Sequence, residues 1–381
     1  MCAMLLADLG ATVLKVDRLE PSGLGFPRPL KFSLAMRGRK VISLDLKRPE
    51  AVELVLRLVE NADGMIDPFR PGVIERLGIG PDECLRRNPR IVVGRATGWG
   101  QTGPLSQSAA HDLNYIALTG ALHMIGRKGQ PPTPPVNFLG DYAGGALYLA
   151  LGMVSAILES RHSGKGQVVD SSIIDGTASL MSPVLGLYAA GIHRPERGTN
   201  ILDSGAPFYE VYECADGLWI SIAPIEAKFF AELIRLLPID PADVPTQWDE
   251  KEWPRLHALF TEIFRRQPRD YWCKLLEGTD ACFAPVLTAA EAPAHPHNRA
   301  RGTYIEIDGV VQPRPAPRFS RTDPGTPLPP QPSDNSDVHG ALDGWLERGE
   351  IQQLIDSGVL PRVPPVAPAT PIAPKKSPAA S

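Results

Sequence analysis

Short apolar runs alternate with helical segments over roughly the first hundred residues, and this alternation limits the possible folds more than any other feature. Four short runs are predicted to be strands: residues 11–17, which are rich in Val and Leu, and residues 41–46, 64–67 and 91–96. Residues 49–61 have the periodicity of an amphipathic helix, with Pro49 in its first turn. Strands that alternate with helices pair in parallel through crossover connections. The sequence therefore predicts an α/β fold with a doubly wound sheet.

The first of these strands follows a helix that starts almost at Met1. Residues 1–9 have a helical pattern, and Gly10 ends it just before the strand run. A helix that leads into a strand is the second half of a βαβ unit, whose first strand precedes the helix. We therefore expect the large domain to be without its first strand in this sequence.

A second region has antiparallel character. Residues 208–214 and 218–222 alternate apolar and polar side chains around Ala215-Asp216-Gly217, which predicts a hairpin. Helical patterns follow, and a Pro/Ala-rich end has too few apolar side chains to order itself. The predicted divisions are a large domain over residues 1–190, a linker over 191–204, a small α+β domain over 205–300, a return segment over 301–358 and a disordered tail over 359–381.

Charge and cysteine content exclude several classes of function. The net charge of −4 gives no general attraction to nucleic acid or to an anionic membrane. The longest apolar run, residues 144–158, is shorter than a membrane span and is predicted to be a buried helix. The five cysteines have no metal-ligand spacing and are expected to be reduced, mostly buried thiols. These features favour a cytoplasmic protein without a metal, with a peroxisome or mitochondrion as the alternative in a eukaryote.

Residues 109–145 contain the strongest candidates for catalysis. His111 and Asp141 each stand just before a predicted helix, residues 113–122 and 142–159. One proton carrier on each side of a carbon is what an enzyme needs to remove a proton from one face and return it to the other. His111 could equally be an ordinary polar residue, and Asp141 an acid that complements a helix dipole.

Other residues in this stretch have two interpretations as well. Asp112 is placed to cap the helix that follows it. Gly144 and Gly145 leave room for a ligand at the start of the second helix, where free N–H groups could hold an oxyanion.

Basic residues gather early in the chain, near the predicted strand ends: Lys15, Arg18, Arg37, Arg39, Lys40, Lys47, Arg70 and Arg76. Such residues usually form a solvated face. At strand ends of a parallel sheet, however, they could bind a multiply phosphorylated cofactor. The glycines of residues 98–104 are a weak signal, because no Walker A or Gly-x-Gly-x-x-Gly fingerprint is present.

Ten short segments in a fixed order resemble the racemases of the family III CoA-transferase superfamily. They are residues 2–11, 16–18, 44–47, 69–73, 97–104, 111–115, 140–145, 164–167, 200–209 and 313–317. The resemblance implies a Rossmann-like large domain formed by both chain ends, a smaller α+β domain, and two subunits interlocked as a homodimer. It implies an isomerase of branched-chain lipid metabolism that interconverts 2-methylacyl-CoA epimers, with CoA as part of the substrate and no separate cofactor.

The resemblance also assigns residues to roles. His111 and Asp141 match the acid/base pair, and Glu226 matches the acid that partners the histidine. The matches to positions that bind CoA or lie beside the thioester are Arg18, Leu44, Asp45, Leu46, Lys47, Arg76, Ala110, Asp112, Leu113, Asn114 and Tyr115. No nucleic-acid or membrane partner is implied.

The chain departs from the family pattern at two places. Family members carry about twenty more residues at the start, with the first strand and a loop that touches CoA, a length that suits a strand–loop–helix unit. Ala110 stands where a glycine is usual and could crowd the thioester. Two alternatives therefore stay open: a CoA-transferase that uses Asp141 as a nucleophile, and an inactive CoA-binding homologue.

Overall fold

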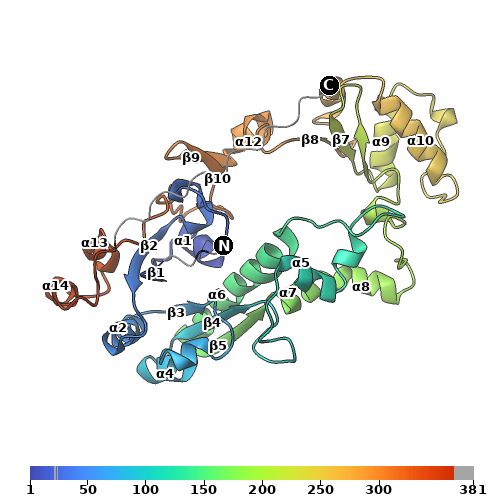
Figure 1. Cartoon of the computed structure of the whole chain (residues 1–381). Coiled ribbons are helices and arrows are strands. Elements are labelled where there is room, and N and C mark those ends of the chain that lie inside the picture. Colours follow the sequence, from blue (N-terminus) through green and yellow to red (C-terminus); the bar gives the residue numbers. More distant parts are fainter. Residues whose placement is uncertain (21–22, 24, 364–381) are drawn as a thin grey trace, which may run out of the picture. The chain divides into compact units, whose positions relative to one another are not determined.

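The computed structural model describes residues 1–20, 23 and 25–363, and it has a mixed α/β fold, which confirms the predicted class (Figure 1). The chain divides into two compact units. Unit 1 contains Met1–Asp112, Gly140–Gly176 and Gly302–Ser381, and unit 2 contains Leu113–Leu139 and Thr177–Arg301. Unit 1 thus draws on both ends of the chain. The domain boundaries expected from the sequence stay a prediction, and most of the predicted tail lies outside the described residues.

Unit 1 contains the predicted parallel strands. β1 (Val13–Arg18) pairs with β2 (Arg39–Leu44), and β3 (Gly64–Asp67), β4 (Val92–Thr97) and β5 (Gln167–Ser172) form a second sheet in that order. Every pairing within these two sheets is parallel, as the alternation of strands and helices predicts. The carboxyl ends of neighbouring strands therefore lie at a shared sheet edge.

Helix α2 (Pro49–Glu60) shows why this core forms. Pro49 starts it at a position where the missing N–H costs nothing, and its apolar positions recur at helical spacing. Its buried face, which includes Leu54 and Leu58, packs with Ile42 and Leu44 of β2 in the main core of unit 1. The other helices of the unit are α1 (Cys2–Asp8), α3 (Val73–Arg76), α4 (Pro81–Arg87), α6 (Tyr148–Ser163), α13 (Val338–Leu342) and α14 (Arg348–Asp356).

In the two parallel sheets of unit 1, the outermost strands each have one strand partner among the described residues: β1 and β2 in the first sheet, β3 and β5 in the second. β1 pairs only with β2 and β3 only with β4 among the described residues. All side chains of β1 and most of β3 are partly exposed, whereas inner strands of parallel sheets are normally buried on both faces.

The outer edge of β2 is covered by the return segment. The buried amide of Asn335 accepts the Ser43 N–H at 2.7 Å and donates to the Ser43 carbonyl at 2.9 Å, as a neighbouring strand would. A buried ion pair makes a second connection: Arg37 binds Asp8 of α1 at 2.6 Å and also donates to the carbonyl of Pro313. Arg37 is therefore not available to a phosphate, although the sequence grouped it with the basic residues at strand ends.

The helix that contains Asp141 differs from the prediction. It begins at Phe138, four positions before the predicted start at residue 142, and its first part is a π-helix, Phe138–Leu147, that continues into α6. Its backbone lies very close to α7 (Ile173–Leu180), because a Cβ added at Gly176 would stand 1.8 Å from the Gly144 carbonyl oxygen. Only glycine fits at Gly176 in this contact.

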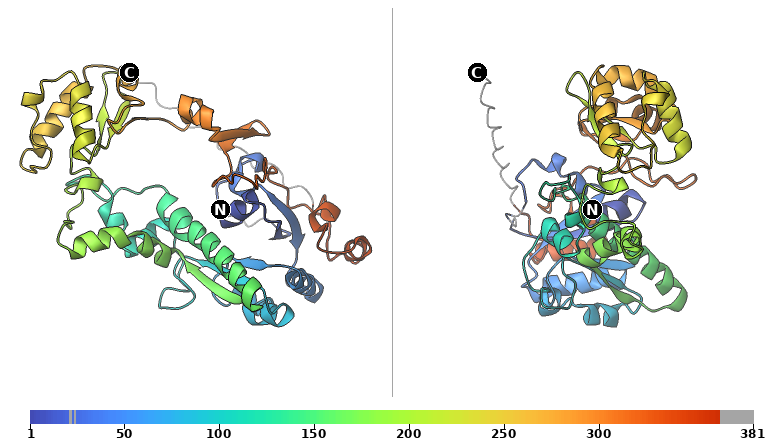
Figure 2. Two further views of the ribbon diagram at one scale, coloured as in Figure 1. Left: turned by 180° about the vertical axis from the view of Figure 1, so that it is seen from behind. Right: turned by 90° about the vertical axis from the view of Figure 1, so that its right-hand side faces the viewer.

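Helix α6 is buried on one face only, which corrects the expectation of a buried helix. Leu149 and Met153 pack on β4 and β5, beside which the helix runs (Figures 1 and 2). An opposite stripe of four apolar side chains is between 49% and 70% exposed: Leu147, Leu151, Val154 and Leu158. By length and composition, Phe138–Ser163 is the one segment among the described residues that passes a test for a membrane span.

Unit 2 contains the predicted hairpin and its helices. β6 (Glu210–Glu213), β7 (Trp219–Ile222) and β8 (Phe283–Val286) form an antiparallel sheet. The sequence did not indicate β8, which is four residues long and contains a proline. The helices are α5 (Asp112–Leu118), α8 (Ser182–Ala189), α9 (Ala227–Leu236), α10 (Trp253–Phe264), α11 (Arg269–Leu276) and α12 (Pro296–Arg301), and β9 (Tyr304–Ile307) pairs with β10 (Val310–Pro313) in unit 1.

The helix predicted over residues 173–190 is interrupted. It forms α7 and α8 with Met181 between them. Pro183 lies in the first turn of α8, and its missing N–H and its ring prevent one continuous helix. The cysteines are all free thiols, as expected, and Cys2, Cys84 and Cys214 are buried.

Candidate active site

A single hydrogen bond joins the two segments that the sequence selected for catalysis. The backbone N–H of Asp141 donates to Oδ2 of Asp112 at 2.7 Å. Asp112 directly follows His111, so the chain at His111 and the chain at Asp141 lie on the two sides of this bond. Two residues far apart in the sequence are thereby brought to one place in unit 1.

The accessibility of the two candidates suits a ligand site. The His111 side chain is exposed and Asp141 is partly exposed. Asp141 is the fourth residue of the π-helix rather than its cap, so it lies among the N–H groups at the helix start that have no partner within the helix. Asp112 is the first residue of its own helix α5, and its carboxylate accepts an N–H from the other segment.

The same bond changes which N–H groups can hold an oxyanion. The sequence suggested the N–H groups at the Asp141 helix as a group. Since the N–H of Asp141 itself already donates to Asp112, it is not available to a substrate oxygen. Any donor from this helix must come from a neighbouring residue.

The predicted CoA-binding residues lie where parallel strands end. Arg18 is the last residue of β1 and pairs in register with Leu44, the last residue of β2. Arg76 ends the short helix α3, which follows β3. Arg18, Lys47 and Arg76 are exposed, and within the described part of the chain none of them forms an ion pair. Exposed cations at this sheet edge suit phosphate groups.

The residues between Leu44 and Lys47 have different surroundings. Leu44 is 1% exposed and belongs to the core, so only its backbone can reach a ligand. Asp45 and Leu46 are partly exposed, and the Asp45 carboxylate accepts the N–H of Lys47 at 3.0 Å. This turn holds the chain at the end of β2 and directs the segment into α2.

The remaining residues predicted to belong to the site differ in their exposure. Ala110 is partly exposed, Leu113 and Asn114 are exposed, and Tyr115 is buried. Glu226 belongs to unit 2, where it precedes α9; it is exposed and its carboxylate makes no capping bond to that helix. Their roles stay predictions.

A charge network that the sequence did not indicate lies beside this sheet edge, with Arg95 and Asp67 buried and Glu75 exposed. Arg95 of β4 contacts Asp67 of β3 at 3.2 Å and Glu75 of α3 at 2.7 Å. Burial raises the pKa of Asp67 above its usual value, although the Phe69 N–H and Arg95 oppose the shift. No motif marks this network, because it joins three elements through tertiary contacts.

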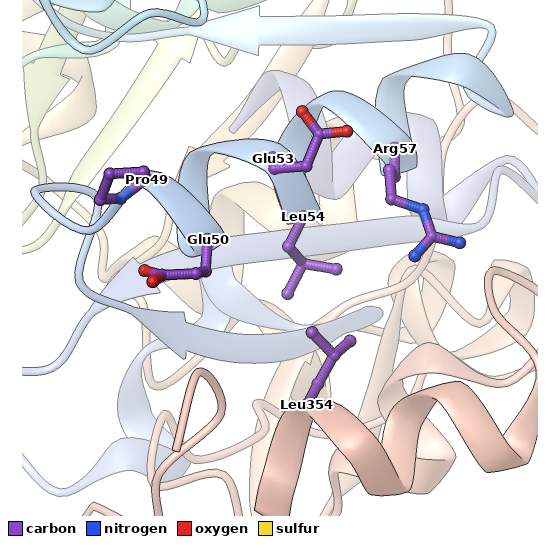
Figure 3. A pocket seen from close by; sticks show the side chains of 6 residues that line it. All are labelled: Pro49, Glu50, Glu53, Leu54, Arg57 and Leu354. Carbon is purple, nitrogen blue, oxygen red and sulfur yellow. The ribbon is translucent and has the colours of Figure 1, made fainter. Parts of the chain in front are cut away.

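Two surface hollows lie in unit 1, away from the two candidate proton carriers. One hollow lies between α2 and α14, where Leu54 and Leu354 point toward each other, with Glu53 and Arg57 nearby (Figure 3). Another is lined by Arg95 together with acidic side chains of α3, α4 and β5. Neither hollow is lined by His111 or Asp141. The described residues contain no cluster of three potential metal ligands.

Comparison with known proteins identifies the class of this fold and site. The sequence profile of CoA-transferase family III matches residues 1–338, and the chain belongs to this family. It is 43% identical over 323 residues to the alpha-methylacyl-CoA racemase of Mus musculus, covering 84% of this chain and 82% of that protein. The racemase of Homo sapiens is 40% identical over 326 residues, with the same coverage of both chains. A CAIB/BAIF family protein from Brucella suis has a similar structure, with a TM-score of 0.74, 27% identity, and coverage of 92% of this chain and 94% of that chain.

Replacing Arg95 should leave a buried charge without its partner. We expect Arg95→Met to lower the free energy of unfolding by about 3–5 kcal/mol, because Asp67 is almost fully buried. Arg86→Met, which breaks an exposed pair with Glu83, should change the urea midpoint little, because solvent screens an exposed ion pair. Urea unfolding of both variants measures the difference, and equal midpoints would contradict the assignment.

The cost of Arg95→Met should depend on pH. Because the folded state holds the Asp67 proton more tightly than the unfolded chain, Asp67 favours the folded state at low pH and loses this contribution as the pH rises through its raised pKa. In acid, Asp67 carries its proton with or without Arg95, so the free energy of unfolding of the variant should there be nearest to that of the native chain. The difference should grow as Asp67 loses its proton and be largest at neutral pH.

Proposed function

We propose that this chain is a racemase that interconverts the 2R and 2S epimers of 2-methylacyl-CoA thioesters. The observation that carries the proposal is the hydrogen bond between Asp112 and Asp141, which brings His111 and Asp141 to one place. The relatives named alpha-methylacyl-CoA racemase support the same reaction. The substrate would be an acyl-CoA, and the reaction needs no further cofactor.

The proposed reaction moves one proton off C2 and another onto it. His111 takes the C2 proton from one face, and the electron pair of the C–H bond moves to the thioester oxygen to form an enolate. Asp141 then gives its carboxyl proton to the opposite face, and the pair returns from oxygen to C2. The other epimer reacts with the roles reversed, and each acid/base group contributes roughly 10²–10⁴-fold to the rate.

Other groups would support this exchange. Backbone N–H groups near Asp141, other than its own, would hold the enolate oxygen. The family resemblance predicts for Glu226 the role of an acid that partners a catalytic histidine, and such an acid fixes the imidazole tautomer and stabilises its charged form. Arg18, Lys47 and Arg76 would bind the CoA phosphates, since they are exposed cations at the ends of parallel strands.

A CoA-transferase reaction is the second candidate, because the family takes its name from it. In that reaction the Asp141 carboxylate would attack the thioester carbonyl, form an acyl anhydride and release the CoA thiolate. The thiolate would then attack the Asp141 carbonyl of the anhydride, which releases the first acid and leaves CoA as a thioester on Asp141. The carboxylate of an acceptor acid would attack this thioester, and the released thiolate would attack the acceptor's carbonyl, which gives the new acyl-CoA and frees Asp141. A histidine next to the residue that binds Asp141 favours racemisation, since the anhydride route needs no second proton carrier.

The first strand of the large domain stays part of this proposal. A strand between β1 and β3 would explain why these two strands each have only one strand partner and are partly exposed. Hydrogen exchange at the amides of β1 and β3 tests this, because slow exchange there would show that the edges need no further strand.

Solvent deuterium distinguishes the two reactions. We expect the chain, given one 2-methylacyl-CoA epimer in deuterated water without any acceptor acid, to place deuterium at C2 and form the other epimer. His111→Ala and Asp141→Ala should each lower epimer formation by about 10²-fold or more, since each removes one proton carrier. Chiral chromatography and mass spectrometry measure both products.

The opposite results would reject this proposal. Turnover that appears only with an acceptor acid would identify a transferase. Binding of acyl-CoA with no deuterium uptake would identify an inactive homologue.

The cations at the strand ends should affect binding rather than chemistry. We expect Lys47→Ala and Arg18→Ala each to raise KM for the acyl-CoA by about tenfold, because each loses a charged hydrogen bond to phosphate, while kcat changes little. Arg86→Ala is the matched control, since Arg86 is also exposed but is paired with Glu83. Unchanged KM in the first two variants would place CoA elsewhere.

A second copy of the chain is the proposed cover for the exposed stripe of α6. Four apolar side chains in a row favour a protein interface, and they include Leu151 and Leu158. We expect the native chain to sediment as a dimer and Leu151→Glu to shift it to a monomer, whereas Glu159→Lys on the same helix should not. A native monomer that binds lipid vesicles would instead assign the stripe to a membrane.

A further inference from the structure

The Asp112 carboxylate is buried, although a residue that only caps a helix does not have to be. Asp112 is 6% exposed, although both its sequence neighbours, His111 and Leu113, are exposed. A carboxylate is rarely buried unless its oxygens are hydrogen-bonded, because losing water costs free energy. The fold must therefore gain something from this residue that compensates for its burial.

What it gains is a fixed position for Asp141. Oδ2 of Asp112 accepts the Asp141 N–H at 2.7 Å, a short distance that is typical of a bond to an ionised acceptor. The other oxygen, Oδ1, is buried and has no hydrogen-bond partner among the described residues. One strong hydrogen bond thus holds the Asp112 side chain, and its donor is the backbone N–H of Asp141, the second proton carrier.

This hydrogen bond affects the orientation of the backbone at Asp141 because Asp141 lies at the start of a π-helix. The N–H groups of the first turn have no acceptor within the helix, so their direction depends on outside partners. Asp112 supplies one such partner for Asp141. Without it, the backbone at Asp141 could turn relative to His111 although the rest of the helix stays in place.

We propose that Asp112 is a positioning residue for the reaction, which fixes Asp141 relative to His111 so that the two can act on opposite faces of one carbon. The inference rests on the proposed racemase function. It predicts that a loss of the Asp112 acceptor impairs inversion more than it impairs deprotonation. Each proton carrier can still take a proton from its own face and return one there, but inversion needs both carriers in register.

Two rates separate this role from a structural one. Deuterium uptake with retained configuration reports one carrier acting alone, and deuterium uptake with inversion reports both. We expect Asp112→Ala to lower the inversion rate on the order of 10²-fold, as a displacement of about 1 Å does, and to lower retention exchange much less. KM for the acyl-CoA should stay within about threefold, because the Asp112 side chain is buried and the substitution leaves the backbone, the part of this position that can lie beside a thioester, unchanged.

The variants include a rescue and a control. Asp112→Asn keeps an oxygen that can accept the Asp141 N–H and should restore most of the inversion. Asp337→Ala removes another carboxylate that accepts a backbone N–H, that of Gly340 at 3.0 Å, at the start of α13 in the same unit. It should lower Tm and leave the ratio of inversion to retention exchange unchanged. If Asp112→Ala does not fold, Asp112→Leu fills the space without an acceptor and is read in the same way.

The outcomes distinguish failure of the inference from failure of the function. A native chain that exchanges no deuterium rejects the proposed function. The positioning role alone is rejected if the native chain inverts its substrate but Asp112→Ala or Asp112→Leu does not change the ratio of the two rates. In that case the inversion rate and the retention-exchange rate fall equally or not at all. A fall in inversion that Asp112→Asn does not reverse also rejects it, because the bond to Asp141 would then not be the cause.

Discussion

The contact between a buried carboxylate and one backbone N–H connects the parts of this molecule that matter for its chemistry. Asp112 binds Asp141 across a gap of almost thirty residues in the sequence, and everything proposed about proton transfer depends on that bond. It also uses a donor at the helix start that would otherwise be free for a substrate. The bond therefore places one proton carrier and narrows the choice of groups that can hold the enolate.

The edge of the parallel sheet supplies the cations proposed to bind the CoA phosphates. Parallel pairing puts Arg18 beside Leu44 at the ends of β1 and β2, so cations that are distant in the chain meet at one edge. Not every basic residue is available there. Arg37 is buried against Asp8, and Arg95 is used to offset the buried charge of Asp67. A basic residue in these strands can therefore either bind a ligand or pair with an acid inside the protein, and its burial decides which.

Much of the fold could be predicted, because it depends on local patterns. The apolar periodicity of residues 49–61 and the hairpin signal at Ala215-Asp216-Gly217 correspond to α2 and to the turn between β6 and β7. The start of the Asp141 helix was predicted four residues late. Apolar periodicity does not distinguish an α-helix from the wider π-helix, and the close contact of Gly144 with Gly176 involves a partner that local sequence does not specify.

The sequence by itself determined the alternation of strands and helices, the parallel pairing that follows from it, and which residue types are available for acid/base chemistry. Only the tertiary structure decided that Asp112 turns to Asp141, that Arg37 is internal, and that one face of α6 stays exposed. The physical reason is that strand and helix signals act between neighbours in the chain. Burial and hydrogen bonding between distant segments exist only once the chain has folded.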